Sequence, residues 1–291
     1  MKKKSVRKSC LLGIIIAASL VCAGFFLFFR RAQPSPIEEE IFQGITYTRD
    51  VYTSPHLALI HVIKIDLQEP GIRILVTPGN PKVDLPLKGR TTSDFLNDFD
   101  LQVAINGDGF TPWHSNTFFD YYPHRGDPVD VIGFAASEGT VYSHDTDKEP
   151  SLYFSRTNQA RFNTPIGGSY NVISGNLMLV KNGKALRNLG TSPSPRTAVA
   201  LDRANRHLIL VVVDGRQPGY SEGISLSTLA EVLIFHGSYT AMNMDGGGSS
   251  TLVVEGLFGN ANILNSPVNN GIPGRERVVG NHLGIFAKPL P

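Results

Sequence analysis

The sequence predicts an α+β fold: a single domain with a large mixed, mainly antiparallel β-sheet core and a few amphipathic helices, preceded by one transmembrane helix. Three observations predict it. Short runs rich in Val, Ile and Leu recur between turn residues, and the 291 residues include 29 glycines and 19 prolines. Only two segments have apolar residues at helical spacing. A long uncharged run stands apart at the N-terminus.

The apolar runs have the length and composition of strands. They cover residues 45–52, 57–67, 72–78, 101–106, 130–137, 170–175, 177–181, 196–202, 207–215, 240–244, 250–254 and 280–287. Tight turns join several of them, at Glu138-Gly139, Asn182-Gly183 and 202–205. Because two-residue turns connect antiparallel neighbours, many of these strands should pair antiparallel.

The two helices are predicted from caps and apolar spacing. Residues 91–100 have hydroxyl and Asp caps and place Phe95, Leu96 and Phe99 on one face. The second helix begins at Ser225 or Ser227 and ends at Gly237, a residue type that commonly terminates helices. Both helices should pack on the core.

The N-terminal run indicates a membrane anchor. Five basic residues lie in 1–9, and the 20 residues 10–29 carry no charge, which is long enough to span a bilayer as a helix. A cleavable signal peptide is the alternative, but its apolar core would be shorter and would end at a small-x-small site, whereas this run continues through four phenylalanines into Arg30 and Arg31. The basic residues predict that 1–9 is a cytoplasmic tail. We expect residues 30–43 to be a linker and 44–291 to be the folded domain, in the periplasm or outside the cell.

Charge and cysteine content exclude several classes of protein. Seven of the 27 basic residues lie in 1–31. The rest of the chain has the other 20 basic residues and all 25 acidic residues, which gives it a net charge of −5. Nucleic acid is therefore not an expected partner. Both cysteines, Cys10 and Cys22, fall in the apolar run, so the exported domain has no disulfide or thiol chemistry. These features are typical of a bacterial envelope protein.

One segment has more turn residues than a hairpin needs. Asp245 ends an apolar run, and Gly246, Gly247 and Gly248 follow before Ser249 and Ser250 lead into the next run. It is not a phosphate-binding P-loop, because it has no lysine and precedes a strand, and the glycine spacing does not match a serine-nucleophile elbow. Glycines let backbone approach a ligand closely. The alternative is a bulged hairpin in which Asp245 caps its own turn.

Other strand ends carry similar residues. Asn106, Gly107 and Asp108 follow one strand, Asp214 and Arg216 follow another, and Arg196 opens a third. If these ends converge, they supply carboxylates for acid–base chemistry and guanidinium groups for a phosphate. The alternative is a set of unrelated turns.

Histidines and metals add little. His124, in an aromatic-rich loop, is a candidate donor to a phosphate oxygen, although a loop histidine is more often unrelated to function. No metal-ligand spacing is present, so the sequence implies no metal and no cofactor.

Five motifs in order, from about residue 102 to 286, resemble the phosphodiester glycosidase family. They are AINGDGF, PRTAVA, VVVDGRQPGYSEG, LSTLAEVLIFHGSYTA and NMDGGGSSTLVV. The resemblance implies hydrolysis of a sugar-1-phosphodiester to free sugar and a phosphate monoester. It assigns family positions to Asn106, Asp108, Arg196, Asp214, Arg216, Asn243, Asp245, Ser249 and Ser250. The first motif departs from the family, which commonly has Asn-Gly-Gly-Phe-Phe or Asn-Gly-Asp-Phe-Phe there, so substrate preference can differ.

The resemblance also suggests a mechanism. Asp245 or Asp214 would act as nucleophile or base around an oxocarbenium-like transition state, with Asp108 as a further catalytic carboxylate candidate. Arg196 and the amides of Gly246–Gly248 would stabilise the leaving phosphate. The expected substrate is a glycan carrying sugar phosphates, in the envelope or an extracellular polysaccharide. A non-catalytic polysaccharide-binding module is the alternative, and a metal-dependent phosphodiesterase that cuts P–O bonds is less favoured.

Overall fold

The structure is a computed structural model that describes residues 13–20, 24, 31–54, 56–117, 120–144 and 148–291. The predicted cytoplasmic tail and most of the predicted membrane segment 10–29 lie outside the described residues. Residues 13–20 are helical. Within the described ranges, no helix is both long and apolar enough to cross a membrane.

Eight strands form the largest sheet, in the spatial order β1-β2-β3-β19-β18-β20-β16-β17. They are β1 (Ile37–Phe42), β2 (Ile45–Tyr52), β3 (Ala58–Asp66), β16 (Leu177–Lys181), β17 (Lys184–Ala185), β18 (Arg196–Leu201), β19 (His207–Val213) and β20 (Thr240–Asn243). β18 pairs antiparallel with both β19 and β20. Its first residue therefore lies at the edge where its two neighbours end, which is the edge that carries the candidate site.

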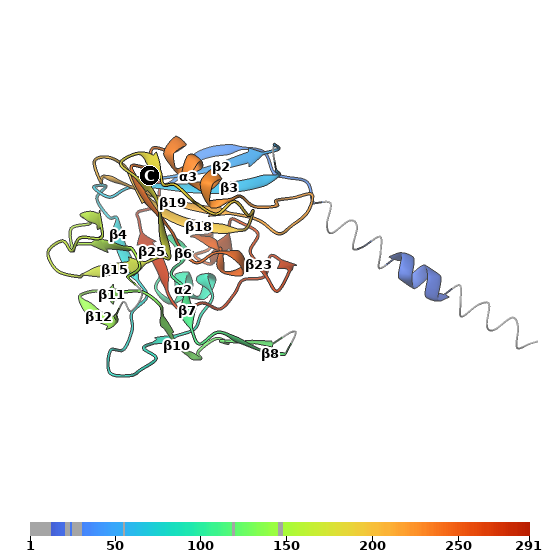
Figure 1. Ribbon diagram of the computed structural model, residues 1–291, viewed down its shortest axis with the longest axis horizontal. Helices are drawn as coiled ribbons and strands as arrows, with labels where there is room; N and C mark the ends of the chain where they lie inside the picture. The colour runs from blue at the N-terminus through green and yellow to red at the C-terminus, as the bar shows by residue number, and fades with distance from the viewer. Residues whose placement is uncertain (1–12, 21–23, 25–30, 55, 118–119, 145–147) are drawn as a thin grey trace, which may run out of the picture.

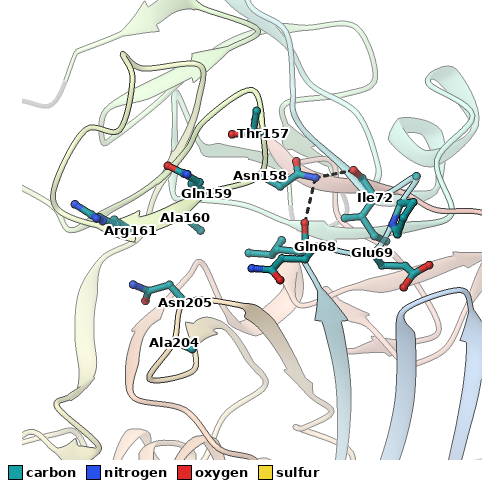
Figure 2. Close-up of a pocket in the computed structure, with 13 residues that line it drawn as sticks. Gln68, Glu69, Ile72, Thr157, Asn158, Gln159, Ala160, Arg161, Ala204 and Asn205 are labelled. Atoms are coloured by element: carbon teal, nitrogen blue, oxygen red, sulfur yellow. Dashed lines mark hydrogen bonds between the residues drawn. The ribbon is translucent and has the colours of Figure 1, made fainter.

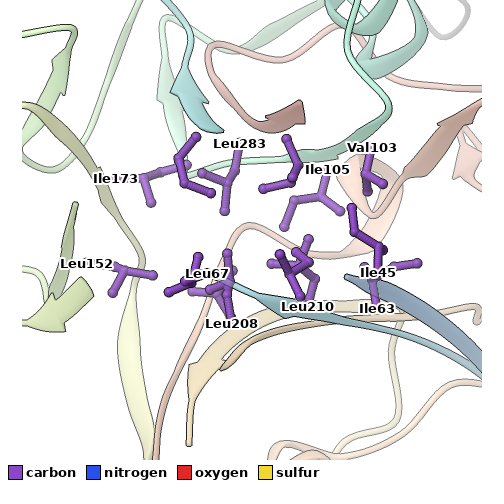
Figure 3. Packing of buried hydrophobic residues seen from close by; sticks show 14 of the residues in the cluster. Ile45, Ile63, Leu67, Val103, Ile105, Leu152, Ile173, Leu208, Leu210 and Leu283 are labelled. Atoms are coloured by element: carbon purple, nitrogen blue, oxygen red, sulfur yellow. The ribbon is translucent and has the colours of Figure 1, made fainter. Parts of the chain in front are cut away.

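A five-stranded sheet packs against the inner face of the large one. Its spatial order is β22-β21-β6-β25-β4. The strands are β4 (Arg73–Val76), β6 (Val103–Asn106), β21 (Leu252–Glu255), β22 (Ala261–Ile263) and β25 (His282–Phe286). Ile63 and Leu210 of the large sheet meet Ile105 and Leu283 of the second sheet in the central core (Figure 3).

One helix covers the outer face of each sheet (Figure 1). On α3 (Leu226–Phe235), Leu229 and Leu233 pack with Ile60 and other residues of the large sheet. On α2 (Thr92–Asp98), Phe95 and Leu96 pack with residues of the second sheet. Side chains of a strand alternate between faces, so neighbouring residues serve different layers. The result is a four-layer arrangement of helix, sheet, sheet and helix.

Four smaller sheets complete the domain. A second five-stranded sheet contains β11 (Ala135–Ser137), β12 (Thr140–Ser143), β13 (Ser151–Phe154), β14 (Ala160–Phe162) and β15 (Asn171–Ser174). The others are β5 (Leu87–Lys88), β10 (Pro128–Val131) and β7 (Phe110–Thr111); β8 (His114–Thr117) with β9 (Asp120–Tyr122); and β23 (Val268–Asn269) with β24 (Ile272–Pro273). The β8–β9 hairpin and β23 both lie close to the candidate site.

The predicted helices and tight turns are confirmed. Thr91 caps α2 in a reciprocal capping box with Asp94, and the hydroxyl of Ser225 accepts from the Thr228 amide at the start of α3. At the turn between β11 and β12, Glu138 and Gly139 have φ of 49° and 87°. Positive φ at both central residues is the geometry of the hairpin turn that fits twisted strands.

Two predictions are corrected. Residues 37–42, assigned to the linker, form β1 and pair with β2, because an edge strand can be polar where only one side of it meets the sheet. The single large mixed sheet is instead several sheets, and every ladder between strands of the described chain is antiparallel. The α+β class itself, with few helices, is confirmed.

Candidate active site

The glycine-rich segment 245–250 carries the chain from one sheet to the other. β20 belongs to the large sheet and β21 to the second sheet, and the two strands do not pair with each other. Between them Gly247–Ser249 form one turn of 3-10 helix, with Gly247 at φ 63°. The hairpin alternative is therefore wrong. The extra turn residues are needed because the chain must cross between layers at the edge of both sheets.

Asn106 fixes the position of this bend. Its Nδ2 donates to the Asp245 carbonyl at 2.8 Å, and its Oδ1 accepts from the Thr197 hydroxyl at 2.8 Å and the Thr251 amide at 3.2 Å. The Asp245 amide in turn donates to the Gly107 carbonyl at 3.1 Å. Asn106 is fully buried, so it holds three strand ends together rather than contacting a substrate.

Arg196 lies beside the bend, as its place at the start of β18 requires. The Gly247 amide donates to the carbonyl of Pro195, the residue before Arg196, at 3.0 Å. The Arg196 guanidinium donates to the carbonyls of Ile224 at 3.2 Å and Ser192 at 2.8 Å, so its direction is fixed by backbone. Burial, and then the charge of Arg216, lower the pKa of Arg196. The two arginines therefore share one neighbourhood.

Asp245 is the partly exposed carboxylate of the site. Its Oδ1 accepts from the Gly246 amide at 2.8 Å. Burial raises the pKa of Asp245, and a hydrogen bond from Ser249 and the charge of Arg277 act in the opposite direction. Burial lowers the pKa of Arg277, and Asp245 opposes that shift. The charges of the two side chains therefore influence each other at the bend.

Two guanidinium groups lie directly against the glycines. A Cβ atom added to Gly248 would lie 2.8 Å from Cζ of Arg277, and one added to Gly247 would lie 3.1 Å from both terminal nitrogens of Arg216. Arg277 also donates to the Ser249 hydroxyl at 3.3 Å and to Asn269 Oδ1 at 3.2 Å. The glycines are thus required to let cations, rather than a ligand, approach the backbone.

This arrangement leaves two of the three glycine amides without the role expected of them. The Gly246 amide is used by Asp245 and the Gly247 amide by Pro195. Neither is available to a phosphate. The positive charge of the site comes instead from Arg196, Arg216 and Arg277.

An aromatic cavity of 370 Å³ adjoins the bend, and Arg277 lies in its wall. Trp113 and Tyr121 stack on one another with ring centroids 5.8 Å apart, and Cζ of Arg277 lies 5.5 Å from the Trp113 ring centroid. Half of the Trp113 surface is exposed. Exposed aromatic faces beside polar groups are suited to the apolar face of a sugar ring.

His124 lines the same cavity, but two carboxylates hold its ring. Its Nε2 lies 2.6 Å from Asp120 and its Nδ1 lies 3.0 Å from Asp127. These hydrogen bonds raise the pKa of His124, Asp120 contributing more. A ring with both nitrogens engaged has no free donor for a phosphate oxygen.

Asp214 does not reach the cavity. Its side chain has no exposed surface, and Oδ1 accepts from Asn265 Nδ2 at 3.0 Å and from the Ser266 amide at 2.7 Å. Oδ2 lies 3.4 Å from Nε2 of His61, which is itself bonded to Tyr47. Asn265 also donates to the Ser250 carbonyl at 3.1 Å. Asp214 therefore supports the bend from behind, contrary to a role as nucleophile.

Asp108 is buried as well. Its carboxylate accepts from the amides of Gly109 at 2.7 Å and Gly133 at 2.9 Å. Burial, and then the charge of Glu149, raise the pKa of Asp108. An added Cβ at Gly107 would collide with Asn281, so this glycine is required by packing. Neither residue contacts the cavity, and the structure gives Asp108 a structural role.

Three further predicted residues are buried beneath the bend. Asn243 donates to Asn176 Oδ1 at 3.0 Å and to the Met244 carbonyl at 2.7 Å. Ser249 contacts Arg277 and Asp245, whereas the Ser250 hydroxyl has no partner among the described residues. Nowhere in the described ranges of the chain does a group of three or more His, Cys, Asp or Glu side chains lie so that it could hold a metal ion.

Sequence reasoning missed Arg277 and the Trp113–Tyr121 pair. Arg277 lies 28 residues after Ser249, in a segment with no local signal of function. Trp113 and Tyr121 were visible only as part of an aromatic loop. The pairing of β8 with β9 and the packing of Arg277 on Gly248 bring them to the bend.

One ionisable carboxylate, three guanidinium groups and an aromatic cavity at a sheet edge define a class of protein that handles anionic sugar compounds. The chain belongs to the phosphodiester glycosidase family, whose model matches residues 99–286.

The chain is similar to known proteins over most of its length. The SPbeta prophage-derived uncharacterized protein YomE of Bacillus subtilis is 25% identical over 245 residues, covering 74% of this chain and 36% of that protein. The catalytic domain of zebrafish N-acetylglucosamine-1-phosphodiester alpha-N-acetylglucosaminidase, autoinhibited by its pro-peptide, superposes with a TM-score of 0.58 at 18% identity. The match covers 89% of this chain and 92% of that domain. A hypothetical protein from Synechocystis gives 0.61 at 16% identity, covering 88% of this chain and 64% of that one.

Proposed function

We propose that this protein hydrolyses the glycosidic bond of a sugar-1-phosphodiester, releasing free sugar and leaving a phosphate monoester on the other partner. The observation that carries the proposal is the mutual influence of the Asp245 and Arg277 charges at the bend, where Arg277 also lies in the wall of the aromatic cavity and Arg196 and Arg216 lie nearby. A carboxylate next to several cations suits a reaction in which positive charge develops on the sugar and negative charge on phosphate.

The reaction breaks the bond between the anomeric carbon and the phosphate oxygen. The electron pair of that bond leaves with the phosphate, which becomes a monoester, and water supplies the hydroxyl on the anomeric carbon. Asp245 acts as the nucleophile or as the base that accepts the proton of the attacking water. The guanidinium groups stabilise the departing phosphate through charge-assisted hydrogen bonds. Trp113 and Tyr121 orient the sugar by contact with its ring.

The proposed substrate is an envelope or extracellular polysaccharide that carries sugar phosphates, with α-N-acetylglucosamine-1-phosphate as the proposed type. We infer that residues 10–29 anchor the chain in a membrane, with 1–9 in the cytoplasm and the folded domain on the other side. The composition of this segment supports the inference. Retention of the chain in the membrane pellet after alkaline extraction tests the anchor, and its release would contradict it.

Hydrolysis is tested with the purified full chain and a synthetic α-sugar-1-phosphodiester. Product analysis should find free reducing sugar and phosphate monoester. Asp245→Asn should lower kcat by about 1,000-fold, and Arg277→Met should lower kcat/KM by about 100-fold. The matched controls Asp84→Asn and Arg187→Met change exposed residues elsewhere and should stay within about twofold.

Two outcomes would refute the proposal. Sugar phosphate among the products would mean that a P–O bond is cut. Binding of the diester without turnover, unaffected by Asp245→Asn, would favour the alternative of a non-catalytic polysaccharide-binding module.

A further inference from the structure

Two connected cavities lie at the end of the large sheet opposite the bend. One, of 630 Å³, is formed by 67–72, 157–161 and 204–205 (Figure 2). The other, of 620 Å³, is formed by 161–163, Met178, Lys181, Asn182, Leu186, Arg203, Asn205 and 239–240. Arg161 and Asn205 line both. We name the second one the basic cavity.

The position of the basic cavity follows from β18. Arg196 begins this strand at the bend, and Arg203 lies in the turn just beyond its other end. Seven residues of extended chain separate them by roughly 20 Å. The basic cavity is therefore not part of the candidate active site.

Its charge is one-sided. Arg161, Lys181 and Arg203 line it, and no Asp or Glu does. Among the described residues, none of the three has a carboxylate within salt-bridge distance. The whole chain beyond residue 31 has a net charge of −5. Three unpaired cations in one hollow of a negatively charged domain fit an anionic ligand.

The remaining lining fits a sugar-containing anion. Arg203 lies over the Tyr239 ring, with 5.2 Å from Cζ to the centroid. The backbone of Tyr239 is fixed by bonds to Gly183 and Leu201 at 2.8 Å each. Asn182 and Asn205 add amide groups at the rim. Aromatic, amide and cationic groups together are the set that binds sugar rings and phosphates.

The adjoining cavity extends the same surface. Nδ2 of Asn158 donates to the Ile72 carbonyl at 2.6 Å (Figure 2). This hydrogen bond fixes the loop that carries Gln159 and Arg161. The hollow thus continues past Arg161 with a polar lining, as an extended polymer would need.

The N-terminal segment joins the folded domain at the end of the large sheet that carries the bend, not at the end that carries the basic cavity. Gln33 donates to the Tyr220 carbonyl at 2.7 Å, and Tyr220 follows the end of β19 that carries Asp214. A ligand of the basic cavity therefore approaches from the side away from residue 33. This favours a polymer over lipid headgroups of a membrane that holds the N-terminal segment.

We propose that the basic cavity is a second, non-catalytic binding site for a polymer with phosphodiester linkages. The basic cavity holds one part of the polymer while another part of the same polymer, roughly 20 Å away along β18, reaches the bend. The identity of the polymer as substrate rests on the proposed function, but binding to the cavity does not.

The test uses the full chain and poly(glycerol phosphate), which has no glycosidic phosphodiester and cannot be hydrolysed by the proposed reaction. The variant Arg161→Ala/Lys181→Ala/Arg203→Ala should bind it about tenfold more weakly or worse, since each exposed charged contact contributes a fraction of that factor. Its hydrolysis of a small sugar-1-phosphodiester should be unchanged.

The matched control is Lys64→Ala/Lys82→Ala/Lys88→Ala, which removes the same charge from exposed positions outside the cavity. It should bind within about twofold of the unmodified chain. Equal losses in the two triple variants, unchanged binding in the first, or equal binding of neutral dextran would each overturn the proposal. Tighter binding of anionic lipid vesicles than of the polymer would assign the cavity to a membrane and also overturn it. Absence of hydrolysis with normal polymer binding would count against the proposed function alone.

Discussion

Gly248 provides the sharpest test of the role of Arg277. The substitution Gly248→Ala adds one methyl group that would overlap Nη2 of Arg277 and lie 2.8 Å from its Cζ, whereas ordinary contacts begin at 3.4 Å. The φ of Gly248 is outside the left-handed region, so alanine adds no backbone strain there. The flexible guanidinium should therefore retreat by about 1 Å while the fold persists. A displacement of that size at a catalytic group can cost about 100-fold in rate, or about 2.7 kcal/mol.

The assay is kcat/KM on a sugar-1-phosphodiester, with thermal unfolding measured in parallel. Gly190→Ala is the control, because its added Cβ meets only Leu226 Cδ1 at 3.6 Å. In an Arg277→Met background, Gly248→Ala should have little further effect, since both changes remove the same interaction. An equal loss in both backgrounds, or full activity of Gly248→Ala alone, would refute the reasoning.

Three further predictions concern the buried and flanking groups. Asp214→Ala should lower the free energy of unfolding by about 3 kcal/mol in urea denaturation, because Asn265 and the Ser266 amide lose their acceptor; a loss of activity without destabilisation would contradict this. The pKa of Asp108 is raised in the fold, so its stabilising contribution is present at low pH and is lost as pH rises from about 4 through the raised pKa. Asp108→Asn should remove this decrease in the free energy of unfolding with rising pH. Parallel pH profiles of the unfolding free energy for the variant and the unmodified chain would contradict the prediction. His124→Ala should change kcat/KM by less than about threefold, because its ring nitrogens are already engaged; a tenfold loss would return it to substrate binding.

Local sequence predicted the elements well where short-range chemistry decides them. The α2 cap at Thr91, the α3 cap at Ser225 and the turns at Glu138-Gly139 and Asn182-Gly183 are present as expected. Such signals involve residues within a few positions of one another. The edge strand β1 was missed because a strand that pairs on one side can be polar.

The site was predicted in part for the same reason. The ends of β6, β19 and β20 and the start of β18 do meet, because antiparallel pairing brings alternate strand ends to one edge. What the pattern could not give was the direction of each side chain. Asp214 and Asp245 look alike in sequence, yet Asn265 and Ser266 bond to Asp214, which is fully buried, whereas Asp245 is partly exposed.

The sequence by itself determined the class of fold, the caps and turns, the family, and the bend at 245–250 as the place to look. Only the tertiary structure decided that the bend crosses between two sheets, that Arg277 lies against Gly248, and that Asp245 is partly exposed whereas Asp214 is fully buried. The physical reason is range. Propensity and turn chemistry act between near neighbours, whereas burial and charge pairing depend on segments that meet only once the chain has folded.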